Sequence, residues 1–110
     1  MAAYEVSVAA ATAVLGYDLV RDEPWTVSDR PRVITGLAVM GSAAAGDSAV
    51  DLLVGMYRVE RVFNRTTGFP NMDDMLPLDA YVPPGSKISM PVVDAPATNA
   101  LNAKILVEDL

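Results

Sequence analysis

The chain has 110 residues, a formal net charge of −6, no histidine and no cysteine. Its length fits one domain, 1–110. The negative charge disfavours nucleic-acid binding, because a phosphate backbone would be repelled, and the missing residue types exclude disulfides, thiolate metal sites, cysteine nucleophiles and Ser-His-Asp catalysis. We therefore expect no enzymatic activity and no cofactor.

The first third of the chain predicts short strands. Apolar and polar residues alternate from Tyr4 to Ala10, which is typical of a strand with one buried face. Residues 1–16 have no basic segment and include Glu5, so we expect no signal peptide. A second short strand is expected at Tyr17–Val20, with Trp25–Val27 resuming it after Pro24 and a turn at 28–31.

The middle of the chain predicts two long apolar strands, Arg32–Gly41 and Ser48–Phe63, joined as a hairpin at Ala43–Asp47. Neither has a clean polar face, which is expected when both faces of a sheet are covered by protein. In so short a chain, we expect another copy or another protein to provide part of that cover. The uncharged stretch that ends before Asp47 is too short to cross a bilayer, because a spanning helix needs about 20 residues; we expect no membrane insertion.

The last third predicts a loop and further strands. Pro77 restricts its neighbourhood to an edge segment, because proline donates no hydrogen bond to a central ladder, and Pro84-Gly85 predicts a tight turn. In chain order the expected elements are a polar loop at Asn64–Asp74, the edge segment Met75–Leu78, a turn at Tyr81–Ser86, a strand at Lys87–Val93, a turn at Asp94–Asn99 and a final strand at Leu101–Val107.

About eight short strands with regularly spaced turns and no helix indicate an all-β fold, an antiparallel β-sandwich in a single domain. The inward-facing positions predict the core. They are Val6, Val8, Leu37, Val39, Leu52, Val54, Ile88, Met90, Ile105 and Val107.

A Val-Pro-Pro-Gly-Ser turn at 82–86 that feeds an alternating strand, a short Pro/Asn loop and a terminal strand resembles the closing hairpin of small viral jelly rolls. Such modules occur in minor capsid, cement and spike proteins. The resemblance implies a jelly-roll-like sandwich that associates with itself, as a trimer or pentamer, and with other structural proteins in a virion or extracellular assembly. Secreted β-sandwich binding modules share much of the same pattern.

A loop cluster of carboxylates is the candidate metal site. Asp73 and Asp74, with Asp79 nearby, could supply oxygen ligands to Ca²⁺. Their spacing does not match an EF-hand, and Asp and Asn also favour turns through local hydrogen bonds. A solvated turn is thus the competing interpretation.

Five residues are the candidate interface. Arg58, Arg61 and Arg65 form a basic cluster in an acidic chain, with Arg58 expected on the same face as Glu60 and Arg61 on the other. Phe69 is the expected apolar anchor of the long loop, and Trp25 is the only tryptophan. Asn64-Arg-Thr66 is also a formal glycosylation sequon in an expected surface loop.

The sequence leaves two functions open. The first is a structural subunit that self-associates and builds or decorates a larger assembly, such as a virion capsid or cement layer. The second is a non-catalytic binding module for a carbohydrate or protein, with or without calcium, because aromatic side chains on a sandwich face can stack on sugars.

Overall fold

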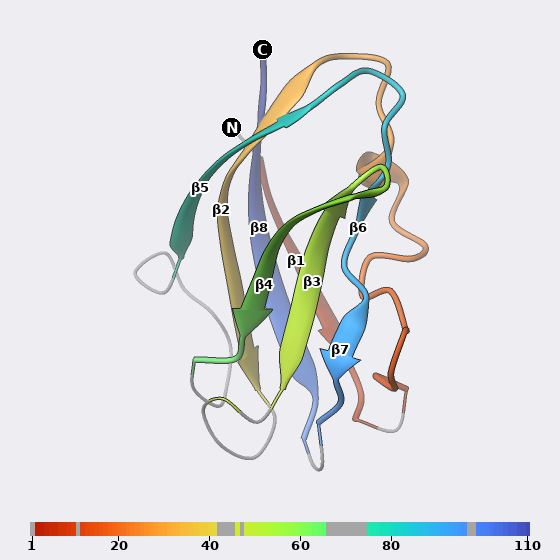
Figure 1. Ribbon diagram of the computed structural model, residues 1–110, viewed down its shortest axis with the longest axis vertical. Coiled ribbons are helices and arrows are strands. Elements are labelled where there is room, and N and C mark those ends of the chain that lie inside the picture. Colours follow the sequence, from red (N-terminus) through yellow and green to blue (C-terminus); the bar gives the residue numbers. More distant parts are fainter. Residues whose placement is uncertain (1, 11, 42–45, 47, 66–74, 97–98) are drawn as a thin grey trace.

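The computed structural model describes residues 2–10, 12–41, 46, 48–65, 75–96 and 99–110, and within them it shows two antiparallel sheets and no α-helix (Figure 1). One sheet has the strand order β1-β8-β2-β5, and the other has the order β4-β3-β6 with β7 also paired to β3. A short 3-10 turn, η1 (Pro24–Thr26), precedes β2. The strands are β1 (Ala2–Val8), β2 (Arg32–Gly41), β3 (Ala49–Val54), β4 (Tyr57–Phe63), β5 (Leu76–Val82), β6 (Ile88–Ser89), β7 (Val92–Asp94) and β8 (Leu101–Asp109).

The strands pair as in a chain doubled back on itself at its middle. β3 pairs with β4, β2 with β5, and β1 with β8, so the first and last strands lie side by side and both termini are at one end (Figure 1). The β6–β7 region pairs with β3 on one side and with residues 16–19 on the other. There the backbones of Gly16, Tyr17 and Leu19 form hydrogen bonds with those of Val92 and Met90. This nested pairing places the strands in two antiparallel sheets that pack face to face. The expected β-sandwich is confirmed.

The core lies between the two sheets. All ten residues predicted for it are there: eight are buried, and Val6 and Val8 are partly buried against the rest. Alternation predicted these positions because side chains along a strand point to opposite faces.

The strand β2 is buried on both faces within a single copy of the chain. Its inward residues Leu37 and Val39 belong to the core, and on the opposite face Ala38 and Met40 are buried as well. The side chain of Met75 lies over this outer face beside Gly36 and Leu106. The expectation that both faces are covered is therefore correct for β2, but this cover needs no second molecule.

The expected long hairpin is wrong in two respects. Residues 48–63 are not one strand, because a two-residue turn at Gly55–Met56 divides them into β3 and β4. Gly55 adopts a φ of +62°, which glycine tolerates and which suits the first central position of a tight hairpin turn. Moreover, β2 and β3 lie in different sheets, so the expected hairpin partners face each other across the core.

The shorter segments differ in detail. The expected strand Tyr17–Val20 is not a full strand, because only one regular β-bridge, between Asp18 and Pro91, forms there. Trp25–Val27 is not a strand, because η1 occupies its beginning. The strand expected at Lys87–Val93 is interrupted into β6 and β7, and Pro91, which has no N–H to donate, sits in the gap.

Candidate functional site: an apolar cleft between the β4 and β5 edges

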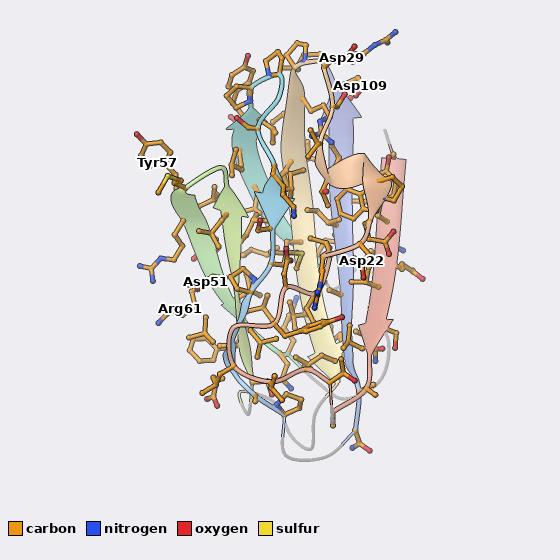
Figure 2. All side chains as sticks on the ribbon, turned by 90° about the vertical axis from the view of Figure 1, so that its right-hand side faces the viewer. Asp22, Asp29, Asp51, Tyr57, Arg61 and Asp109 are labelled. Carbon is orange, nitrogen blue, oxygen red and sulfur yellow. The ribbon has the colours of Figure 1, made fainter. Side chains whose placement is uncertain are left out.

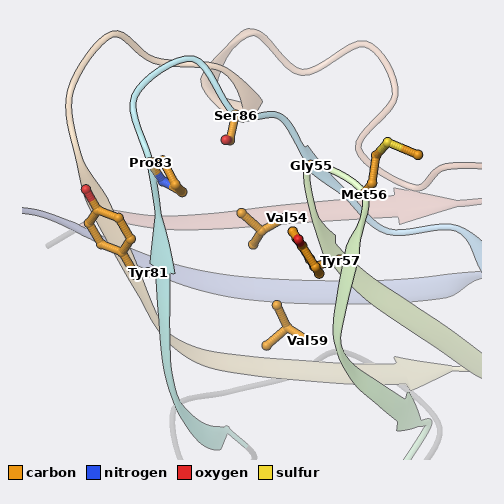
Figure 3. A pocket seen from close by; sticks show the side chains of 8 residues that line it. All are labelled: Val54, Gly55, Met56, Tyr57, Val59, Tyr81, Pro83 and Ser86. Carbon is orange, nitrogen blue, oxygen red and sulfur yellow. The ribbon is translucent and has the colours of Figure 1, made fainter.

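An apolar cleft of about 500 Å³ opens at the end of the sandwich where β3 turns into β4 (Figure 3). It lies between β4, the edge of one sheet, and β5, the edge of the other. Pro83 and Ser86 of the following turn close it above. The side chains that give it its character are Val54, Met56, Tyr57, Val59 and Tyr81.

The strand β4 carries an extra residue, Val59, in the lining of this opening. Val54 of the core pairs with Tyr57, so Tyr57 belongs to the core-facing side of its strand. The register shifts between Leu52 and Leu53, which leaves Val59 as the additional residue of a β-bulge. Tyr57 is nevertheless 82% exposed and Met56 95% exposed. Apolar side chains on the core side of an edge strand are thus left facing solvent.

The same bulge changes the faces predicted for the arginines. Arg58 pairs with Leu53 and Arg61 with Asp51, and these two partners share the outer face of the sheet. Arg58 and Arg61 therefore lie on one face, while Glu60 pairs with buried Leu52 on the other. The expected arrangement, with Arg58 beside Glu60, is wrong because an inserted residue reverses the alternation beyond it.

Arg61 and Asp51 form an ion pair on that outer face (Figure 2). Arg61 Nε lies 2.8 Å from Asp51 Oδ1, and Nη2 lies 3.3 Å from Oδ2. The hydrogen bond to Asp51, aided by charge attraction, raises the pKa of the Arg61 guanidinium. Phe63, two residues further along β4, is 53% exposed.

Trp25 has a packing role inside the subunit. Its ring stacks on Tyr4, with 4.2 Å between the ring centroids and 6° between the planes. Beneath it, Arg32 is 4% exposed and donates hydrogen bonds to the carbonyls of Trp25 (2.5 Å) and Thr26 (3.2 Å). The half-buried indole therefore packs against the core on Tyr4, and Arg32 holds the backbone that carries it. A contact between Trp25 and a partner stays a prediction.

Asn64 is a structural residue. Its side chain is 2% exposed, accepts a hydrogen bond from Ser48 N and donates one to the carbonyl of Gly41, both at 2.8 Å. This amide is buried between Ser48 and Gly41, so a glycan on its nitrogen could not reach solvent without displacing the side chain. The expectation of an exposed sequon at Asn64 is therefore wrong.

The remaining predicted residues are only partly placed. Asp79 is exposed on β5, and the backbone N–H of Arg65 bonds to Val39 O at 3.0 Å. Asp73, Asp74 and Phe69 lie outside the described residues, so the calcium and anchor hypotheses stay predictions. Within the described ranges, no group of three acidic side chains is placed to hold a metal ion.

The cleft residues were not identified as a site from the sequence. The predicted strand Ser48–Phe63 places Met56 and Tyr57 in its interior, and Tyr81 begins the predicted turn Tyr81–Ser86. The signal that could have located them is the lone Gly55 within an apolar run, which permits a hairpin turn and so exposes its neighbours.

No protein family model, curated protein or solved structure matches this chain. Over the described residues, no helix has the length and apolar character needed to cross a membrane.

Proposed function

We propose that this protein is a structural subunit that associates with copies of itself and builds or decorates a larger assembly, such as a virion shell. The observation that carries the proposal is the exposed apolar surface of the cleft. Met56, Tyr57 and Tyr81 are 95%, 82% and 56% exposed, and all three lie at one end of the sandwich. Met and Tyr are both enriched at protein interfaces.

This surface is costly for a monomer in water. Large contiguous exposed apolar patches are uncommon on monomeric proteins and mark sites of association or ligand binding. The pairing of β3 with β4 extends to the turn itself, so polar side chains at the tip of this hairpin would serve the fold equally well. The exposed apolar side chains there are thus not needed for folding. The nested strand pairing resembles that of a jelly roll, an architecture that capsid domains use and that lectins and cupins also use. This resemblance supports the same proposal at the level of architecture.

Sedimentation equilibrium over a wide range of protein concentration tests the proposal. We expect the average mass to rise with concentration toward a defined multimer, and to rise further with salt, because each copy carries a net charge of −6 and added salt screens the repulsion. Tyr57→Ser should weaken association. Leu15→Ser is the matched control, since Leu15 is 69% exposed and lies outside the cleft. A monomer at every concentration and salt would refute the proposal.

A binding module is the second candidate, favoured by the size of the cleft. Its volume of about 500 Å³ lies within the range of about 300–1,000 Å³ that is usual for small-ligand pockets. Two tyrosines at its rim could stack on a sugar ring. Titration with a glycan panel, followed by tyrosine fluorescence, separates the two: saturable binding to a stable monomer, lost in Tyr57→Ser, favours the module.

A further inference from the structure

Over the described residues the sandwich has four lateral strand edges, and three of them carry features that discourage pairing with another chain. β4 contains the bulge at Val59, and the Glu60 carboxylate accepts a hydrogen bond from its neighbour's N–H at 3.1 Å. β5 carries Pro77 and the charged Asp79. The ladder segment at 16–19 is short and irregular. Bulges, charges, proline and short length are the usual ways in which proteins protect an edge.

The fourth edge, β1, has only one of these features, a single charged residue. It pairs with β8 without a register shift over all seven of its residues, Ala2–Val8, and contains neither proline nor glycine. Its one charged residue, Glu5, is neutralised by Lys104, with 3.3 Å between Oε1 and Nζ. Outside the β1–β8 ladder, the described residues make no backbone hydrogen bond to this strand.

The direction of each backbone group in β1 follows from one hydrogen bond elsewhere in the sheet. Val39 O accepts from Arg65 N, so the Val39 backbone points away from β8. Because backbone groups alternate in direction along each antiparallel ladder, Lys104, opposite Ala38, points toward β2 and away from β1. Its partner in β1 is Glu5. The N–H and C=O groups of Ala3, Glu5 and Ser7 therefore face the open edge.

We propose that β1 pairs antiparallel with β1 of a second copy, across a two-fold axis at Val6, to join two four-stranded sheets into one of eight strands. This rests on the proposed function and names one contact through which the subunit would associate. The strand is self-complementary in this register. Tyr4 faces Val8 of the second copy and Glu5 faces Ser7. Apolar side chains therefore lie opposite apolar ones on one face of the pair, and polar side chains lie opposite polar ones on the other.

Charge selects this register over its neighbour. An axis at Glu5 would place two carboxylates directly opposite each other, which is unfavourable in a strand pair. The axis at Val6 instead sets each Glu5 against a serine hydroxyl and pairs every residue from Tyr4 to Val8. A recess of about 270 Å³ beside Val6, with Asp22 and Glu23 at its rim, leaves room on the core side for side chains of the added strand (Figure 2 shows Asp22 on this side).

Proline at Glu5 provides a selective test. The Glu5 N–H faces the open edge, so Glu5→Pro removes no hydrogen bond of the fold but blocks the new ladder. Glu5→Ala is the control, because it removes the charge and keeps the N–H. We expect Glu5→Pro to raise the dissociation constant of the dimer by roughly tenfold or more, since two interchain hydrogen bonds are lost, while Glu5→Ala associates at least as tightly as the wild type.

Deletion of β1 is a poor substitute for this test, because it would also remove Tyr4 from its stack on Trp25 and expose the edge of β8. If Glu5→Pro fails to fold, hydrogen exchange on the wild type gives the answer. The amides of Glu5 and Ser7 should become protected as concentration rises, whereas those of Tyr4 and Val6, which face β8, should be protected throughout.

The outcomes distinguish this inference from the proposed function. A wild type that associates, with Glu5→Pro unchanged in mass or with unprotected Glu5 and Ser7 amides, overturns the β1 contact and leaves self-association through another surface. A wild type that stays monomeric at all concentrations overturns both. Association lost in Glu5→Pro and kept in Glu5→Ala supports both.

Discussion

Asn64 connects three strand ends through one side chain. It binds the last residue of β2, Gly41, and the residue before β3, Ser48, while its own position follows β4. Asn64→Ala would leave a buried N–H and a buried carbonyl without partners, and each such group costs about 1–3 kcal/mol. We expect a loss of roughly 2–5 kcal/mol in the free energy of unfolding, measured by urea denaturation.

Asn64→Asp is the informative comparison. A carboxylate keeps the acceptor for Ser48 N, loses the donor to Gly41 O and adds a buried negative charge facing that carbonyl, so Asn64→Asp should also be destabilised. A variant with Ala that is as stable as the wild type would contradict the structural role of the side chain.

Leu52 and Leu53 are adjacent residues in β3 with opposite environments. Leu52 is fully buried in the core, and Leu53 is half-buried on the outer face. Leu52→Ala should cost about 2–5 kcal/mol, the range for emptying a buried aliphatic site, and Leu53→Ala about 1 kcal/mol. Thermal and urea unfolding of both variants measures the difference. Equal costs would mean that β3 does not have the face assigned to it.

At the scale of the elements, two glycines end strands for different physical reasons. Gly41, at the end of β2, has a φ of +106°, and a Cβ there would lie 2.0 Å from Ala100 O. Gly55, in the β3–β4 turn, has a φ of +62° with open space around it. Both positions disfavour a side chain, but only Gly41 also lacks room for one.

Alanine at each position should separate the two effects. Gly55→Ala should cost about 1–2 kcal/mol, the usual strain of a left-handed residue. Gly41→Ala should cost roughly 2–5 kcal/mol, because displacement of the Ala100 backbone adds to that strain. Denaturant unfolding of the two variants checks the order. A larger cost at Gly55 would contradict the close approach of β2 to Ala100.

The elements also show what the sequence could predict. Alternation located β1 and β8, an uninterrupted apolar run located β2, and Pro77 marked β5 as an edge, because side-chain direction, apolar character and the missing donor of proline are local properties. The division of residues 48–63 was missed, since apolar residues flank Gly55 on both sides. The faces of Arg58 and Arg61 depend on a bulge and the cleft depends on strands from two sheets, so neither could be read from local spacing.

At the scale of the whole molecule, the nested wiring implies an order of folding. β3 and β4 meet through a two-residue turn, whereas β1 and β8 join the two ends of the chain. The entropic cost of closing a loop rises with its length. The central hairpin therefore has the lowest entropic cost of closure and is expected to form first. The β1–β8 ladder is expected to form last, because the earlier pairings shorten the loop that it has to close.

Two core valines at the extremes of this wiring test the order. Val50 of β3 is buried opposite Val62, and Val6 of β1 packs partly buried opposite Ala103. If the hairpin forms first, Val50→Ala should slow refolding with a φ-value of about 0.5 or more, and Val6→Ala should mainly speed unfolding with a φ-value below about 0.3. Stopped-flow chevron plots at low protein concentration measure both without interference from association. A high φ-value at Val6 would mean that the terminal strands pair before the hairpin, and that the chain closes from its ends.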